Sequence, residues 1–394
     1  MTKCSCVVSF LAVAILAGCG DDGGESSELL APPAAGEGVQ FKMTTTLAAG
    51  VEAEHCLFVT APDEEMWVAS EEARFTQGSH HVLLYETSYS AIPTTKEDGQ
   101  EVDTSGVFDC SDGATNGWSV TKLIGGSQNA EGDSILDFPE GVAMPVKAGA
   151  VLLLNVHYIN ASDHAIEPEA RINLYTVPHE EVDIEGDILF LYNPLIRVPE
   201  SGTSRARWRC PVHTDITIAN VQSHMHARGV GYAAMVTGQE PFYVNEAWSN
   251  VPVKAFEPGL EVQAGSSLDY YCDYHGSQDH VVYQGPRTTD EMCMLIGSYY
   301  PADPATASCR DDSGTRLGGE WVGEGTATCA ETMSCVLAID FASAETDPLN
   351  SISDCMVEAD PAVSRETSDF LKCLFSSPNP IVDCAQPIEA CQAK

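Results

Sequence analysis

The chain has 394 residues, with 58 acidic against 19 basic side chains and a formal net charge of −39. So few cations cannot form the phosphate-neutralising surface that a nucleic-acid-binding protein needs, and a hydrophobic content of 44% excludes a disordered acidic chain. The 15 cysteines argue against a reducing cytosol and indicate an exported protein.

The N-terminus predicts a lipoprotein signal peptide over residues 1–18. A basic start precedes an apolar run over residues 7–17, which is too short to cross a bilayer because a spanning helix needs about 20 residues. The run ends in LAGC at residues 16–19, which resembles a bacterial lipobox and makes Cys19 the predicted lipidated N-terminus; an ordinary secretory signal is the alternative. Residues 19–38 are rich in Gly, Pro and acids and predict a flexible tether. We therefore expect a protein of the bacterial cell envelope, periplasmic or at the cell surface, held to the membrane only by its lipid.

Residues 39–312 have the pattern of β-strands. Short runs rich in Val, Leu, Ile, Tyr and Thr alternate with Gly, Pro, Asn and Asp, and helical periodicity is hard to find. The clearest runs are residues 54–60, 82–89, 150–159, 171–177, 216–226 and 232–237. The sequence VKAGAVL from Val146 recurs as VQAGSSL from Val262, an offset of 116 residues that supports two similar modules. We predict an all-β fold with two tandem antiparallel, jelly-roll-like β-sandwich domains at residues 39–182 and 183–312.

Residues 313–394 have a different character. Twelve cysteines remain once the signal peptide and Cys19 are set aside, and six of them fall between Cys329 and Cys391. No C-x-x-C pair supports a zinc-ribbon or thioredoxin-like site. Asp360 and Pro361 before residues 362–374 are typical of a capped helix with proline in its first turn. We predict a small, Cys-rich helical tail stapled by disulfides, with no chemistry of its own.

Five of the 11 histidines occur in arrangements that suit a metal site. His224 and His226 are two residues apart, so in a strand they share a face and can ligate one ion, although such a pair also occurs on surface strands. His80 and His81 would face opposite sides unless a bulge re-aims one of them, and the QGS sequence before them permits a bulge. His157 lies in an apolar run and by itself is typical of a hydrogen-bonded core residue. No G-x-S-x-G, Walker or H-E-x-x-H motif offers a competing chemistry.

Four segments in order resemble the ascorbate-dependent type II copper monooxygenases, the family of peptidylglycine α-hydroxylating monooxygenase and dopamine β-monooxygenase. The segments are HHVLL from His80, LNVHY ending at Tyr158, HMHARG from His224 and DEMC ending at Cys293. They are similar to the family's H-H-M/V-L-L, L-Q-V-H-Y, H-T-H-x-x-G and D-E-M-C segments. The similarity covers roughly residues 45–312.

The resemblance implies two copper ions per chain, each with three ligands. The first copper, in the first domain, would be held by His80, His81 and His157. The second, in the second domain, would be held by His224, His226 and Met292. The first copper would receive electrons from ascorbate or another one-electron reductant. The second copper would bind O₂ and direct hydroxylation of a C–H bond of a substrate held between the domains. The resemblance therefore gives His224, His226 and Met292 catalytic roles. Three imidazoles suit a copper that cycles between oxidation states, and a thioether favours Cu(I).

The resemblance also implies three disulfides. They are Cys56–Cys110 in the first domain and Cys210–Cys309 and Cys272–Cys293 in the second, which leaves the six tail cysteines to pair among themselves. O₂ and a small-molecule substrate are the implied partners, and the oligomeric state stays open.

The positions that contact substrate depart from the family pattern. Gln222 stands where the peptide-amidating member has an arginine for the peptide carboxylate, and an amide cannot form a charge-assisted bidentate pair. Met294 and Ile296 replace an asparagine and a tyrosine, and Asn155 replaces a glutamine. We therefore expect a more apolar substrate pocket at Gln222, Met294 and Ile296, and a substrate other than a glycine-extended peptide.

Two functions are consistent with this sequence. The first is a copper monooxygenase that acts on a small or apolar substrate. The alternative is a non-catalytic lipoprotein that uses the same fold to sequester or deliver copper. Zinc is disfavoured because methionine is a poor ligand for Zn²⁺.

Overall fold

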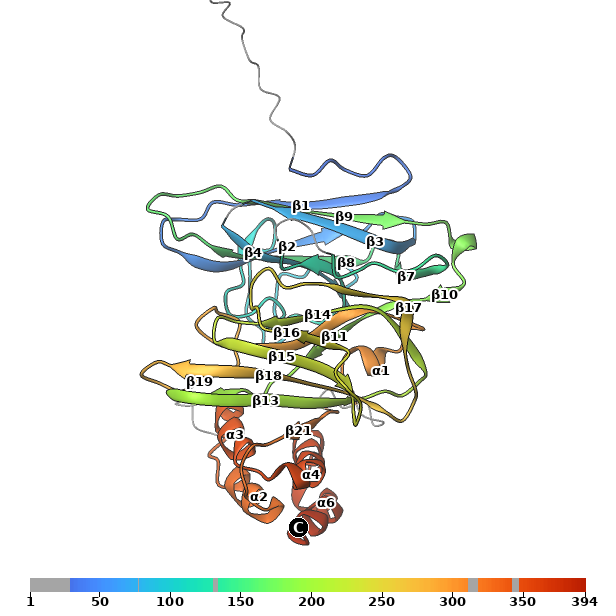
Figure 1. Cartoon of the computed structure of the whole chain (residues 1–394). Helices are drawn as coiled ribbons and strands as arrows, with labels where there is room; N and C mark the ends of the chain where they lie inside the picture. The colour runs from blue at the N-terminus through green and yellow to red at the C-terminus, as the bar shows by residue number, and fades with distance from the viewer. Residues whose placement is uncertain (1–28, 77, 130–133, 311–317, 342–346) are drawn as a thin grey trace, which may run out of the picture.

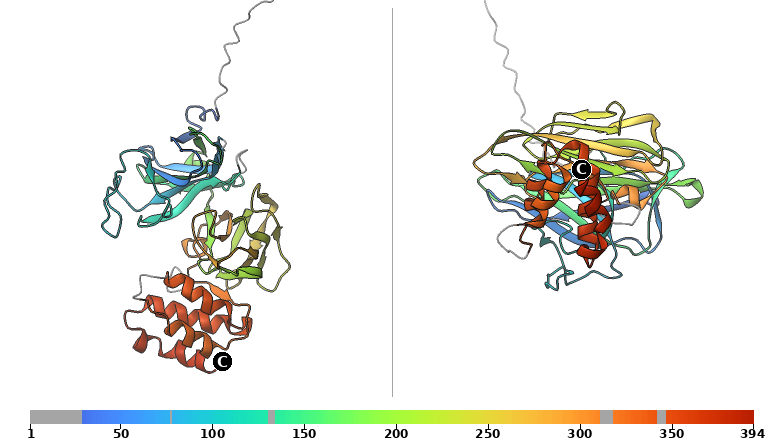
Figure 2. Two further views of the ribbon diagram at one scale, coloured as in Figure 1. Left: turned by 90° about the vertical axis from the view of Figure 1, so that its left-hand side faces the viewer. Right: turned by 90° about the horizontal axis from the view of Figure 1, so that it is seen from below.

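The computed structural model describes residues 29–76, 78–129, 134–310, 318–341 and 347–394. These residues are mostly β-strand, with helices gathered at the C-terminal end, so the predicted all-β class with a helical tail is confirmed. Three parts are stacked one on another: the first strands at one end, the later strands in the middle and the helices at the other end (Figures 1 and 2). The predicted signal peptide, Cys19 and the start of the tether lie outside the described residues. Among the residues with described positions, no helix is long and apolar enough to span a bilayer.

The first part contains two five-stranded sheets, with strand orders β1-β9-β3-β7-β10 and β5-β2-β8-β4-β6. The strands are β1 Gly38–Thr44, β2 Glu52–Thr60, β3 Met66–Phe75, β4 Ser79–Thr87, β5 Phe108–Asp109, β6 Val120–Ser127, β7 Val142–Val146, β8 Val151–Ile159, β9 Glu169–Thr176 and β10 Ile184–Glu185. Side chains of both sheets, such as Phe41 and Ile172 from one and Leu84 and Val156 from the other, form one core. Strand β8 is buried along almost its whole length between β2 and β4, as expected for a continuous apolar run with both faces covered.

The middle part contains a four-stranded sheet, β11-β20-β14-β17, and a five-stranded sheet, β16-β15-β18-β13-β21. The strands are β11 Asp187–Tyr192, β12 Arg197–Val198, β13 Ser201–Pro211, β14 Ile216–Met225, β15 Gly229–Val236, β16 Tyr243–Asn245, β17 Lys254–Val262, β18 Ser267–Ser277, β19 Val282–Tyr283, β20 Cys293–Tyr300 and β21 Glu320–Val322; β12 and β19 pair separately. Leu191, Val221 and Leu295 from the first sheet pack with Trp208 and Tyr270 from the second.

The two β-rich parts share a hydrophobic boundary. Side chains alternate along β20, so Leu295 faces the core of the middle part, whereas Met294 and Ile296 pack into the core of the first part. Ile188 of β11 also packs into the core of the first part. The sheet that carries β11, β14 and β20 therefore contributes to both cores, and this contact positions the site described below.

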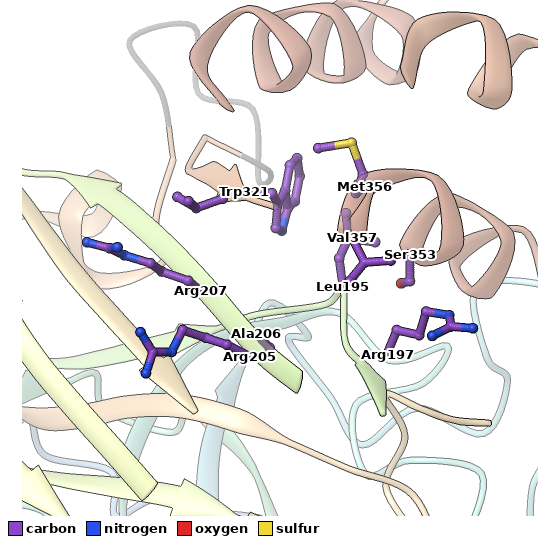
Figure 3. A pocket seen from close by; sticks show the side chains of 10 residues that line it. Leu195, Arg197, Arg205, Ala206, Arg207, Trp321, Ser353, Met356 and Val357 are labelled. Atoms are coloured by element: carbon purple, nitrogen blue, oxygen red, sulfur yellow. The ribbon is translucent and has the colours of Figure 1, made fainter. Parts of the chain in front are cut away.

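The helical tail is joined to the middle part by a strand and by packing. The α-helices among the described residues are α1 Pro304–Ala307, α2 Cys329–Leu337, α3 Pro348–Val357, α4 Ser364–Ser376, α5 Pro380–Asp383 and α6 Ala385–Gln392, and short 3₁₀ helices occur at His179–Glu181 and Pro361–Val363. Strand β21, from the predicted tail, pairs with β13, and the indoles of Trp208 and Trp321 stack with ring centres 5.7 Å apart. Figure 3 shows the junction, where Trp321 and Met356 help to line a cavity of about 30 Å³, enough for little more than water. Asp360 accepts a hydrogen bond from the backbone of Ala362, but the element that it caps is a 3₁₀ helix at Pro361–Val363; the α-helix expected over residues 362–374 begins at Ser364, without a side-chain cap.

The cysteines of the described residues form six disulfides. Three are the pairs that the resemblance implies: Cys56–Cys110, Cys210–Cys309 and Cys272–Cys293. The other three lie within the tail: Cys329–Cys391, Cys335–Cys355 and Cys373–Cys384. The tail helices are short, and these bridges tie them to one another.

Candidate metal centre

Strands β4 and β8 bring three histidines into contact. His81 pairs directly with His157, and the register shifts between Ser79 and His81, so that His80 occupies an irregular position at the start of β4. Gln77 of the predicted bulge sequence lies outside the described residues. The ring centres are 5.3 Å apart for His80 and His157, 5.2 Å for His81 and His157, and 5.6 Å for His80 and His81. Imidazoles that share one metal ion at about 2.0 Å per nitrogen have ring centres roughly 5 Å apart, so this grouping fits a three-histidine site.

Each of these three imidazoles has a buried nitrogen with no hydrogen-bond partner among the described residues. The atoms are His80 Nε2, His81 Nδ1 and His157 Nδ1. A buried polar atom without a partner costs about 1–3 kcal/mol, so three in contact point to a ligand that all of them bind. A copper ion is such a ligand, because imidazole nitrogen suits it.

Glu52 of β2 fixes the imidazole of His157. Its carboxylate accepts a hydrogen bond from His157 Nε2 at 2.9 Å, which leaves the lone pair on Nδ1. It also accepts hydrogen bonds from Thr288 N and Thr288 Oγ1, both at 2.8 Å. Burial alone would raise the pKa of Glu52, but the hydrogen bonds from Thr288 and His157 outweigh burial and lower it. One ionised carboxylate therefore connects the first histidine set to the loop that leads to Met292.

Replacing Glu52 by alanine is expected to weaken copper binding by the first set by about 10–100-fold, because outer partners that orient a ligating histidine have effects of that size. Anaerobic competition with a Cu(I) chelator measures the change. Thr288→Val is the matched control: it removes one of the two Thr288 contacts and leaves the bond to His157. Equal copper affinity in the wild type and in Glu52→Ala would exclude this role.

The second set lies at the end of β14. His224 and His226 are 5% and 1% exposed, and their ring centres are 5.3 Å apart, whereas Met225 between them points into the opposite core. His226 Nδ1 contacts the carbonyl oxygen of Asp290 at 3.1 Å; a carbonyl only accepts, so Nδ1 carries the hydrogen and Nε2 the lone pair. Met225 pairs with Cys293 between β14 and β20, which places Met292 next in register, beside His226.

Glu291 holds the chain that follows β14. Its buried carboxylate accepts hydrogen bonds from the backbone nitrogens of His226 at 3.1 Å and Arg228 at 2.8 Å. Burial raises the pKa of Glu291 to about 7, although these hydrogen bonds and Arg228 lower it. The residue immediately before Met292 thus fixes the backbone of His226.

The two predicted ligand sets are contiguous. The ring of His224 lies 6.3 Å from that of His80 and 6.0 Å from that of His81, so the five imidazoles form one cluster across the two parts. Trp248, which is 36% exposed, covers the edge of this cluster with its ring 6.2 Å from His80. As placed, no three His, Cys, Asp or Glu side chains among the described residues converge tightly enough to enclose a metal ion. The rings are in contact, but the ligating nitrogens would have to turn toward a common point.

The pKa of each of the five imidazoles is lowered, which favours the neutral form at pH 7. Burial is the main cause that lowers the pKa of each one, to about 4 for His157 and His226 and well below the ordinary value for His81 and His224. Neighbouring imidazoles lower the pKa of His81, His157 and His224 further, because two adjacent cations repel. The pKa of His80 is also lowered, mainly by burial. Neutral imidazole is the form that binds a metal, so these rings need not lose a proton to do so at neutral pH.

A cavity of about 740 Å³ adjoins the cluster, between the first and middle parts. His81, His224 and Met292 are among the residues that line it. Its apolar wall comprises Leu83, Tyr85, Phe190, Tyr192, Met294 and Ile296. Among the described residues that line it there is no Lys or Arg. The cavity thus joins both ligand sets to a space with an apolar wall, the acidic residues Glu54, Glu97, Asp112 and Asp347, and no cationic group among its described lining residues.

Glu54 is a buried acid in the cavity wall, whereas Gln222 lies outside the wall. Glu54 lines it and accepts a hydrogen bond from Asn155 Nδ2 at 3.0 Å, and burial raises the pKa of Glu54 to about 7. Gln222, expected in the substrate pocket, is not among the described lining residues. Its amide oxygen accepts a hydrogen bond at 2.8 Å from Gln128, which does line the cavity.

Comparison with known proteins adds one finding. Residues 192–316 match the family model of the copper type II ascorbate-dependent monooxygenase, C-terminal domain. The match supports the copper type II ascorbate-dependent monooxygenase family for this chain. It contains His224, His226 and Met292, whereas the first histidine set lies before it. A comparison with curated proteins gives no match.

Two solved structures show limited likeness. A peptide-N(4)-(N-acetyl-β-D-glucosaminyl) asparagine amidase is 10% identical, with 67% of this chain and 97% of that chain covered and a TM-score of 0.31. The major capsid protein P2 of bacteriophage PM2 is 11% identical, with 65% and 97% covered and a TM-score of 0.27. At these TM-scores neither likeness bears on fold or function.

Residues outside the copper monooxygenase motifs complete the site. Glu52, Gln128 and Trp248 contact the imidazoles, and the sequence analysis named none of them. The E-x-E pattern of Glu52 and Glu54 in a strand was the available signal, because two acids on one face of a buried strand require partners. Gln128 and Trp248 lie in loops, where no periodicity marks them.

Proposed function

We propose that the protein is a copper-dependent monooxygenase that hydroxylates a C–H bond of a small or apolar substrate with O₂ and electrons from ascorbate or a similar one-electron reductant. The observation that carries the proposal is the cluster of five imidazoles beside a cavity that His81, His224 and Met292 line; three of them have a buried nitrogen with no hydrogen-bond partner among the described residues. The match of residues 192–316 to the family model supports it. Copper bound there would supply one-electron redox chemistry with O₂.

The ligands divide into two sets. His80, His81 and His157 would hold the first copper, and His224, His226 and Met292 the second. Glu52, Gln128 and the carbonyl of Asp290 hold hydrogens on the remote nitrogens of His157, His224 and His226, so that the other nitrogen of each ring keeps its lone pair. The Met292 thioether gives the second set a preference for Cu(I) that the first set lacks.

The cavity indicates the class of substrate. Its volume of about 740 Å³ suits an organic molecule of ordinary ligand size. Its apolar wall and the absence of Lys and Arg among its described lining residues disfavour an anionic substrate. Met294 and Ile296 would contact the substrate near the second ligand set.

The setting of the protein is part of the proposal. We infer two tandem β-sandwich domains at residues 39–182 and 183–312, supported by the two pairs of sheets that each enclose a core. The disulfides support an oxidising compartment. Lipidation of Cys19 would hold the protein in the bacterial cell envelope.

Anaerobic copper loading, followed by oxidation, electron paramagnetic resonance and an O₂-uptake assay with ascorbate, tests the function. We expect two coppers per chain, a Cu(II) signal after oxidation and O₂ uptake that depends on the reductant. A stoichiometry near one, or no Cu(II) signal, would contradict the two-site assignment. Full loading without turnover across a metabolite screen would favour the copper-sequestering alternative.

A further inference from the structure

Gln128 belongs to the first part of the chain but makes its hydrogen bonds with the middle part. It follows the end of β6, and its side-chain nitrogen donates to the Gln222 side-chain oxygen at 2.8 Å and to the backbone oxygen of Ser223 at 2.7 Å. Its side-chain oxygen lies 2.9 Å from His224 Nδ1. One amide therefore makes three contacts with β14, and one of them is with a predicted copper ligand.

The orientation of this amide determines the hydrogen on His224. Ser223 presents a carbonyl oxygen, which only accepts, so the Gln128 nitrogen must face it and the Gln128 oxygen must face His224. Turning the amide over would place two oxygens 2.7 Å apart. His224 Nδ1 is consequently the donor, and the lone pair is on Nε2.

Neighbouring contacts hold Gln128 in place. The carboxylate of Glu71 in β3 accepts hydrogen bonds from the backbone nitrogens of Gly126 at 2.9 Å, Ile135 at 3.0 Å and Leu136 at 3.1 Å. These bonds fix the chain on both sides of Gln128 to the first part. Asn129 adds a second bond to the middle part, from its side-chain nitrogen to the Val251 backbone oxygen at 2.8 Å.

We propose that Gln128 is a positioning residue through which the first part completes the second copper site. It keeps the His224 imidazole in the tautomer that offers Nε2, so the second ligand set has its full affinity only while the two parts are docked. This inference rests on the proposed function, since it concerns the second of the two copper sites.

Stepwise copper titration of the full chain tests the role, with a Cu(I) chelator as competitor. In Gln128→Leu, which has similar size and no amide, we expect the affinity of the second site to fall by about 10–100-fold, with the first site unchanged. Met292→Ala identifies which titration step is the second site. Asn129→Ala is the matched control, because it removes a bond between the same two parts without touching an imidazole; we expect at most a small change.

The outcomes separate this inference from the proposed function. If the wild type binds two coppers and Gln128→Leu binds both equally well, Gln128 has no positioning role and the proposed function stands. If Asn129→Ala weakens the second site as much as Gln128→Leu, general contact between the parts is responsible, and the proposal fails. If the wild type lacks a second copper site, both the inference and the proposed function fail.

A second test uses the metal-free protein. ¹⁵N NMR should show hydrogen on Nδ1 of His224 in the wild type, and Gln128→Leu should lose this preference. The same His224 tautomer in both proteins would also overturn the proposal.

Discussion

Replacing Met292 by leucine is expected to lower reductant-dependent O₂ uptake by at least about 100-fold, since even outer partners of metal ligands contribute 10–100-fold. Met292 lines the cavity with His224 and lies beside His226 in the β14–β20 register. Leucine keeps the bulk of the side chain but lacks the sulfur that would bind Cu(I). The first histidine set should keep its copper, so copper per chain should fall from two toward one.

A second methionine provides the control. Met294 lines the same cavity two residues further along the chain, and Met294→Leu removes a sulfur without removing a predicted ligand. Met294→Leu should therefore retain two coppers, measured by metal analysis after the same loading. Two coppers and undiminished O₂ uptake in Met292→Leu would show that Met292 is not a ligand.

Replacing Glu71 by alanine is expected to lower the free energy of unfolding by about 3–5 kcal/mol, because several buried groups lose their hydrogen-bond acceptor at once. The Glu71 carboxylate is 6% exposed and accepts from three backbone nitrogens. Urea titration of the metal-free chain measures the change. Glu71→Gln retains an acceptor oxygen and should cost much less. A loss below about 1 kcal/mol in Glu71→Ala would mean that water or a rearranged backbone satisfies these groups.

The pH dependence of the free energy of unfolding distinguishes the wild type from Glu71→Gln. Burial raises the pKa of Glu71 from 4.5 to about 7, although its hydrogen bonds lower it. Between pH 4.5 and about 7, Glu71 of the folded chain thus keeps a proton that Glu71 of the unfolded chain has lost. The stability contribution of the acid is present below pH 4.5 and is lost as pH rises toward 7. Glutamine does not titrate, so Glu71→Gln should gain stability relative to the wild type from pH 5 to 8; parallel pH profiles would contradict the raised pKa.

Local strand geometry made part of the site predictable. An H-x-H pair on one face of a strand and a bulge at an adjacent histidine pair follow from the two-residue period of a strand. The contact between His81 and His157 joins positions far apart in sequence, so only the resemblance to a family indicated it. That His224 would lie within 6.0 Å of His81 depends on how the two parts pack. Met294 and Ile296 determine that packing by burying themselves in the core of the first part.

The fold was predictable to a similar degree. Short apolar runs bounded by turn residues, such as residues 54–60, lie in strands because β-branched and aromatic side chains suit a buried sheet. Strand β21 has three residues, too few to show the two-residue period of a strand, so the sequence predicts only a helical tail for the segment that contains it. The position of Gln128 carried no motif, since the role of a single polar residue in a loop depends on its partners in three dimensions.

The stacking of Trp321 on Trp208 limits how the chain can be shortened. The matched span ends at residue 316, before β21. A chain cut there would leave β13 as an open sheet edge and expose the indole of Trp208, now 2% exposed. Unpaired edges beside bare aromatic rings promote self-association. The tail, whose Met333 and Phe370 belong to the same core as Trp208, therefore covers a strand edge and an aromatic ring that would otherwise favour self-association.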